Sequence, residues 1–284
     1  MTLWTDLLGA EIRMIRADGV PTRVVSLGSG DPVVLLHGRG GHAETFARTL
    51  PALAAAGHEA IAVDLLGHGL TGRVPGGYPV DRLAAHVVAT LDALGLSRVA
   101  LVGQSLGGWA AALVALRSPG RVRRLALIEP AGLQSEAERL SDSRVRAAYE
   151  RGGRAYEAPT REAVRARLAG LLADPGQVDP ELVDVRMALY GPAEARQVHR
   201  LVRAADNDDL LLTPARLSRL TVPTLLLRGE GGHTPLAVVE AAADAIPGAR
   251  LVTVPGARQW PQYERPALVG DALIRFLTPE ETTS

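Results

Sequence analysis

Cysteine is absent from this 284-residue chain, which excludes disulfide bonds, thiolate metal sites and cysteine nucleophiles. Lysine is absent as well, so every basic residue other than histidine is an arginine. The 31 basic and 31 acidic residues give a formal net charge of zero. A neutral chain has no overall attraction to nucleic acid or to an anionic membrane, so we expect a small-molecule partner rather than either of these.

Long apolar runs are also missing, since no stretch is long enough to span a bilayer. The first residues lack the basic segment and apolar core of a secretory signal peptide, so we expect a cytoplasmic protein. No histidine lies at the spacing of a recognised metal motif, and neither a phosphate-binding loop with lysine nor a dinucleotide fingerprint is present. We therefore expect no metal and no cofactor, and no pattern indicates an oligomeric state.

Short β-rich runs alternate with helical patterns along most of the chain, and 47% of the residues are hydrophobic. Such alternation predicts one α/β unit with a mostly parallel sheet, flanking helices and an insertion. The expected strands are 23–27, 33–36, 60–63, 99–102, 125–128, 222–227 and 251–254. The expected helices of this core are 43–56, 80–94 and 235–245.

The alternation stops in one long segment, residues 133–220, which is polar, rich in arginine and helical in period. We interpret this segment as an inserted helical cap. It divides the chain into a first part of the core at residues 1–132 and a second part at residues 221–284. The polar residues 279–284 are expected to be disordered.

A G-x-S-x-G motif at residues 103–107 follows one expected strand and precedes a helical stretch. Small residues at both ends permit a tight turn that holds Ser105 in a strained conformation beside the positive end of the helix, so we predict that Ser105 is a nucleophile. The glycine-rich segment 37–41 follows another strand. The backbone N–H groups of Arg39 and Leu106 are the candidate oxyanion donors.

These motifs resemble the α/β-hydrolase family, and more narrowly the meta-cleavage product hydrolases, which cut carbon–carbon bonds in aromatic degradation. The resemblance covers residues 20–277 and includes Asp64-Leu65-Leu66-Gly67-His68-Gly69 and Trp260-Pro261-Gln262-Tyr263-Glu264. It implies an α/β-hydrolase fold with an inserted helical cap. Through the segment 181–186 it also implies that Arg186 faces the substrate, the alternative being a solvated helix arginine. Trp260 is a further candidate for the pocket wall.

Both usual partners of the nucleophile are replaced in this sequence. The family has a glycine-histidine-tryptophan segment after the last strand, where this chain reads Arg258-Gln259-Trp260. An amide cannot take a proton from Ser105 at neutral pH. The family also has an aspartate in the loop after Leu227, but here that loop reads Arg228-Gly229-Glu230-Gly231-Gly232-His233-Thr234-Pro235.

Three side chains are candidates to compensate for these losses. His233 either reaches inward to form a dyad with Ser105 or is solvated. Glu129, at the end of the expected strand 125–128, either orients His233, holds a water, or caps the following turn. Gln259 is a candidate hydrogen-bond donor to a substrate carbonyl.

We weigh three functions on this basis. The first is acyl transfer: Ser105, aided by His233, accepts an acyl group from a thioester-like donor, small or carrier-bound, and passes it to an acceptor other than water. Loss of the water-activating histidine disfavours hydrolysis, whereas an intact oxyanion hole still supports acyl chemistry. The second is an ester or carbon–carbon bond hydrolase with a rebuilt Ser105, His233 and Glu129 site. The third is an isomerase, a cyclase or an inactive binder.

Overall fold

An eight-stranded sheet in the order β1-β2-β4-β3-β5-β6-β7-β8 forms the centre of the computed structural model, which describes residues 2–278. The β1–β2 and β2–β4 pairs are antiparallel and all other neighbours are parallel. The strands are Glu11–Ala17 (β1), Val20–Leu27 (β2), Asp31–Leu36 (β3), His58–Val63 (β4), Val99–Gln104 (β5), Val122–Ile128 (β6), Thr224–Gly229 (β7) and Arg250–Val254 (β8). The predicted α/β architecture is confirmed, although β1 was not expected. The tail predicted to be disordered lies outside the described residues.

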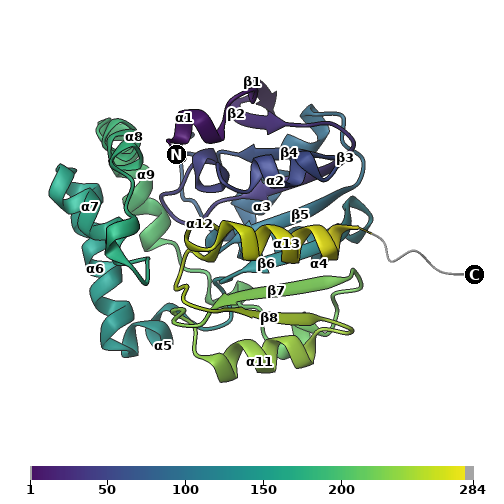
Figure 1. Ribbon diagram of the computed structural model, residues 1–284. Helices are drawn as coiled ribbons and strands as arrows, with labels where there is room; N and C mark the ends of the chain where they lie inside the picture. The colour runs from purple at the N-terminus through teal and green to yellow at the C-terminus, as the bar shows by residue number, and fades with distance from the viewer. Residues whose placement is uncertain (1, 279–284) are drawn as a thin grey trace, which may run out of the picture.

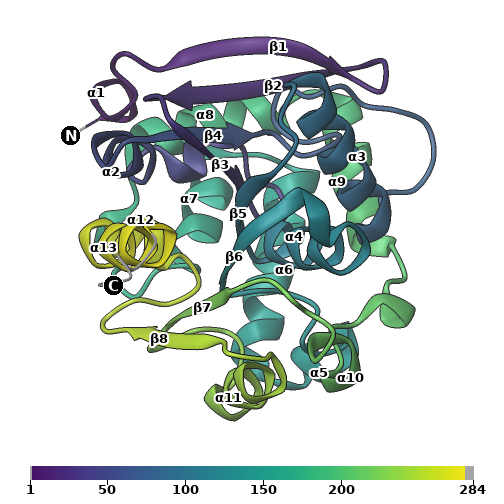
Figure 2. The ribbon, with the colours of Figure 1, turned by 90° about the vertical axis from the view of Figure 1, so that its right-hand side faces the viewer.

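Helices cover both faces of the sheet, with α3 and α4 on one face and α2 and α13 on the other (Figure 2). Alternate residues of β3 explain why its sequence is continuously apolar: Val34 and Leu36 pack into one hydrophobic cluster, and Val33 and Leu35 into the opposite one. The helices outside the insertion are Leu3–Asp6 (α1), Leu50–Ala55 (α2), Val80–Ala93 (α3), Leu106–Arg117 (α4), Leu236–Ala245 (α11), Pro261–Glu264 (α12) and Pro266–Leu277 (α13).

The single helix expected at 43–56 is wrong, because the segment forms a 3₁₀ turn, Ala43–Phe46 (η1), and then α2. Pro51 explains the break, since it lies in the first turn of α2, where its missing N–H costs no helical hydrogen bond.

An inserted helical region between β6 and β7 lies at one end of the sheet (Figure 1). Side-chain oxygens of Ser135, Asp142, Thr160 and Asp179 cap four of its helices and thereby set where each helix begins. The α-helices of this region are Glu136–Ser141 (α5), Ser143–Glu157 (α6), Arg161–Ala169 (α7), Pro180–Tyr190 (α8), Ala193–Ala204 (α9) and the short Pro214–Leu217 (α10). Within residues 2–278, no helix combines the length and apolar character needed to cross a membrane.

A buried charge network follows β4 and anchors the segment next to the glycine-rich loop. The Asp64 carboxylate accepts hydrogen bonds from the N–H groups of Ala43 (2.6 Å) and Leu70 (2.8 Å) and lies 3.4 Å from the Arg23 guanidinium. Arg23 also pairs with Glu44 of η1. The network therefore ties β2, η1 and the turn after β4 together.

Substitution Asp64→Ala should destabilise the protein by about 3 to 5 kcal/mol, because it leaves two N–H groups unpaired and deprives the buried Arg23 of one anion. Urea unfolding followed by circular dichroism measures this. Asp31→Ala is the matched control, since Asp31 pairs with Arg123 with its own side chain 69% exposed, and should cost at most about 1 kcal/mol. Equal effects of the two substitutions would contradict the anchoring role.

Candidate functional site

Ser105 lies at a sharp turn between β5 and α4 and has a backbone φ of 51° and ψ of −116°. Its N–H donates to the carbonyl of Ile128 (2.9 Å), which fixes the turn against β6. Gly107 permits this geometry, because a Cβ at that position would overlap the carbonyl oxygen of Leu36. Leu106 is the first residue of α4, so its N–H has no acceptor within the helix and remains available beside the serine.

His37 holds the first peptide of the glycine-rich loop. Its Nδ1 lies 2.7 Å from the carbonyl oxygen of Gly38, and its Nε2 lies 3.0 Å from the backbone nitrogen of Leu65. A carbonyl only accepts and an N–H only donates, so the ring is neutral with its proton on Nδ1. Burial lowers the pKa of His37 well below its ordinary value, in agreement with a neutral ring. Because the carbonyl of Gly38 is held, the N–H of Arg39 in the same trans peptide plane points the opposite way.

Arg186 of α8 holds the carbonyl of Gly40, two residues after Gly38. Its Nη1 donates to the carbonyl oxygen of Gly40 and to the hydroxyl of Tyr190 (2.6 Å), which itself donates to the same carbonyl (2.7 Å). The residue is 1% exposed, so it is not a solvated helix arginine. Its guanidinium lies 5.4 Å from the ring centre of Trp260, and its Nη2 makes no hydrogen bond to residues 2–278.

The carbonyl of Arg39, between those of Gly38 and Gly40, is held by Arg167 of α7 and Tyr156 of α6. Arg167 Nη2 donates to the carbonyl of Arg39 (2.9 Å), and the Tyr156 hydroxyl donates to the same atom (3.2 Å). The inserted helices therefore fix the backbone that carries one candidate oxyanion donor.

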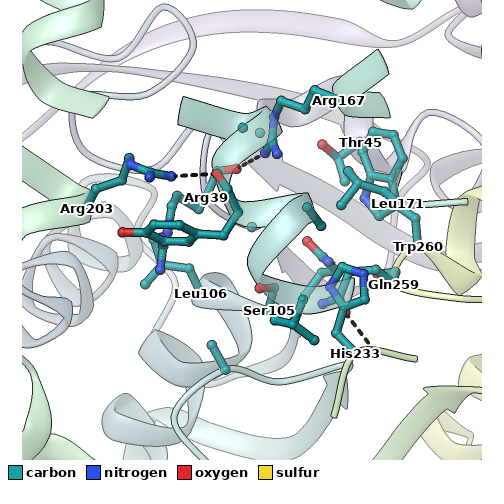
Figure 3. Close-up of a pocket in the computed structure, with 18 of the residues that line it drawn as sticks. Arg39, Thr45, Ser105, Leu106, Arg167, Leu171, Arg203, His233, Gln259 and Trp260 are labelled. Atoms are coloured by element: carbon teal, nitrogen blue, oxygen red, sulfur yellow. Dashed lines mark hydrogen bonds between the residues drawn. The ribbon is translucent and has the colours of Figure 1, made fainter. Parts of the chain in front are cut away.

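The predicted site residues other than Glu129 line one cavity of about 100 Å³. Figure 3 shows Arg39 and Arg203 on one side of Ser105, with His233, Gln259 and Trp260 on the other side. Among residues 2–278, the charged side chains of the lining are all arginines, and no carboxylate of this part of the chain lines the cavity. These arginines are Arg39, Arg139, Arg167, Arg186 and Arg203.

His233 shares this cavity with Ser105, but no hydrogen bond joins the two side chains in the described part of the chain. Its Nε2 is buried and has no hydrogen-bond partner there. Burial, with the charges of Arg139 and Arg258, lowers the pKa of His233 to about 4, so the imidazole is neutral at physiological pH. A neutral imidazole with a free nitrogen is chemically able to accept a proton. The dyad remains a prediction.

Gln259 occupies the place beside this histidine. Its Oε1 accepts a hydrogen bond from the backbone N–H of His233 (3.3 Å), and its own carbonyl accepts one from the Gln104 side chain (3.1 Å). The amide thus helps to hold the His233 loop, and its Nε2 makes no hydrogen bond to another described residue. Its role as a donor to substrate remains a prediction.

Glu129 lies behind the His233 loop instead of in the cavity. Its Oε1 accepts a hydrogen bond from the N–H of Gly229 (2.7 Å), and a Cβ on Gly232 would overlap its carboxyl. The carboxyl therefore holds the end of β7 and the start of the His233 loop, not the turn that follows Glu129, and its link to His233 runs through the loop backbone. Burial raises the pKa of Glu129 to about 7, against the opposing effect of the Gly229 hydrogen bond.

Sequence reasoning missed Arg139, Arg167 and Arg203 of the inserted helices. The arginine-rich composition of this region was the available signal. Composition does not show which arginines point into the cavity, because exposed arginines such as Arg144 and Arg161 lie in the same arginine-rich helical sequence.

The chain is similar in sequence and in fold to known hydrolases. A family model described as alpha/beta hydrolase fold matches residues 31–266. The chain is 31% identical to 2-hydroxymuconate semialdehyde hydrolase of Pseudomonas sp. (strain CF600), over 92% of this chain and 93% of that protein. It is 42% identical to 2-hydroxy-6-oxo-2,4-heptadienoate hydrolase of Pseudomonas putida, over 45% of this chain and only 48% of that protein. The solved meta-cleavage product hydrolase of Pseudomonas fluorescens IP01 has a TM-score of 0.81 and 25% identity, covering 93% of this chain and 97% of that one.

The Glu129→Gln variant should gain stability relative to the wild type as the pH rises. Between pH 4.5 and about 7 the unfolded carboxyl is ionised while the folded one keeps its proton, so the wild type loses stability across this window. The shift from 4.5 to about 7 corresponds to about 3 kcal/mol. Urea unfolding of both proteins at pH 5 and pH 8 measures the difference, and Glu240→Gln controls for the loss of one negative charge. Parallel pH dependence of Glu129→Gln and wild type would contradict the raised pKa.

Proposed function

The chain belongs to the α/β-hydrolase fold family, and we propose that within it the protein is a serine hydrolase of a small anionic substrate. The bond it cleaves joins a carbonyl carbon to an ester oxygen or to a neighbouring carbon. The observation that carries this proposal is that Ser105, His233 and the backbone of Arg39 and Leu106 line one cavity whose charged side chains are all arginines. The name of one relative, a 6-oxo-heptadienoate hydrolase, specifies a substrate with both a ketone and a carboxylate, which supports the carbon–carbon bond.

The first chemical step is attack of Ser105 Oγ on the carbonyl carbon. His233 takes the hydroxyl proton, and the negative charge that develops on the carbonyl oxygen is stabilised by the N–H groups of Arg39 and Leu106. His233 then gives the proton to the leaving oxygen or carbon as the bond breaks. Water next attacks the ester on Ser105, its proton passes through His233, and the acid product leaves. The free Nη2 of Arg186 suits a substrate carboxylate.

Acyl transfer to an acceptor other than water is the second candidate. The specific observation in its favour is that no hydrogen bond joins the side chains of Ser105 and His233, while Gln259, at the position where the sequence resemblance implies a histidine, accepts from the His233 backbone. A thiol acceptor needs less help from a base than water does, because a few per cent is already thiolate near neutral pH.

An activated ester such as p-nitrophenyl butyrate should add one acyl group to the wild-type protein, visible by intact-protein mass spectrometry. The adduct should be lost in Ser105→Ala, which removes the nucleophile, and kept in Ser97→Ala, which removes an exposed serine. Survival of the adduct in Ser105→Ala would falsify the assignment of the nucleophile.

Turnover of the same ester in water should fall by about 10²-fold or more in His233→Ala, because the general base is lost. Added imidazole should restore part of the rate, an outcome that a purely structural role of His233 would not give.

Steady-state kinetics without an acceptor and with 2-mercaptoethanol separates the two candidate functions. An acyl-enzyme that persists in water and discharges only to the thiol would favour transfer over hydrolysis.

A further inference from the structure

The cavity contains more positive charge than one substrate carboxylate requires. Arg186 approaches it from the Trp260 side, where its guanidinium lies over the Trp260 ring. Arg203 and Arg39 lie on the opposite side of Ser105 (Figure 3). The two groups of cations therefore flank the serine, which places the reacting carbonyl between them.

The second group is built around one aromatic ring. The Arg203 guanidinium lies 3.6 Å from the ring centre of Tyr149, and the Arg39 guanidinium lies 5.4 Å from the same centre. Arg203 also donates to the backbone carbonyl of Tyr149 (3.0 Å), which fixes the side chain against α6. A planar guanidinium held in this way keeps its remaining N–H groups directed at a ligand.

The negative charge near this group does not balance it. Glu136 pairs with both Arg39 (3.3 Å) and Arg139 (3.0 Å), so one carboxylate serves two cations. Arg203 makes no ion pair with a carboxylate of the described residues. Positive charges gathered in a partly buried cavity repel one another, and the charge of Arg39 contributes to lowered pKa values of both Arg139 and Arg203, after the larger effect of burial. An anion bound among them relieves this repulsion.

We propose that the substrate carries two anionic groups, one held by Arg186 and the second by Arg203 with Arg39 and Arg139 on the far side of Ser105. The second group is a carboxylate or a phosphate, since planar guanidinium groups bind either with two parallel hydrogen bonds. The placement of the reacting carbonyl between the two anions rests on the proposed function, whereas the binding of a dianion does not depend on catalysis.

The test is calorimetric titration of the Ser105→Ala protein, which keeps the cavity but cannot turn over a ligand. The probes are straight-chain α,ω-dicarboxylates from succinate to suberate and monocarboxylates of the same lengths. At one chain length the dicarboxylate should bind at least about tenfold more tightly than the monocarboxylate, as expected for one added charge-assisted contact. Phosphonocarboxylates of that length then distinguish a phosphate-like second group, which binds more tightly still, from a carboxylate.

Matched variants locate the second subsite. Adding Arg203→Gln to the Ser105→Ala protein should reduce the dicarboxylate preference to about twofold or less. Arg203→Lys in the same background should retain part of the preference. Arg219→Gln, which removes an exposed arginine elsewhere, should leave it unchanged. A preference that is absent at every length, or one that survives Arg203→Gln, overturns the proposal. If the preference is found but the wild type forms no acyl adduct, the dianion subsite stands and the serine hydrolase function fails.

Discussion

The site depends on how three consecutive carbonyl groups, those of Gly38, Arg39 and Gly40, are held. The neutral ring of His37 and the N–H of Gly41 hold the first, and side chains from the inserted helices hold the second and third. Each bond fixes one peptide plane, so together they direct the N–H of Arg39 away from the bonded carbonyls. The sheet alone cannot supply this arrangement. The insertion is therefore part of the machinery that shapes the candidate oxyanion hole, in addition to covering it.

Arg167 and Arg186 bind backbone carbonyls, make no ion pair with a carboxylate of the described residues, and lie next to the nucleophile. Burial of an unpaired charge is unfavourable, and backbone carbonyls compensate for it only in part. The cost is lower where the cation borders a cavity that admits an anion. His233 is kept neutral mainly by its burial, with a smaller contribution from the charges of Arg139 and Arg258. The cavity therefore combines cations that favour an anionic ligand with an imidazole that is uncharged.

Much of the core was predictable from the sequence, because buried parallel strands leave continuous apolar runs and a nucleophile elbow has a local glycine pattern. The edge strand β1 was missed, since its outward residues include Ile12 and Met14, which are exposed, and its pattern therefore lacks a clean alternation. The break between η1 and α2 was missed although Pro51 marked it. Arg139, Arg167 and Arg203 could not be identified as cavity residues, because the direction of their side chains depends on how the inserted helices pack on the loop 38–40. That packing is a long-range property.

Gln259, after β8, is linked to His233, in the loop after β7, by one hydrogen bond. In the described structure Gln259 supports the backbone of His233, and Glu129 supports the start of the same loop through Gly229. A histidine at 259 would lose the amide oxygen that accepts from His233. The two positions are coupled through this hydrogen bond, so the absence of a base at 259 and the presence of an imidazole at 233 belong to one arrangement. In the proposed dyad the imidazole of His233 comes from the loop after β7, and burial with the charges of Arg139 and Arg258 keeps it neutral. An imidazole without a carboxylate partner is a weaker base than one paired with an aspartate, so the proposed dyad favours substrates whose carbonyl is already activated.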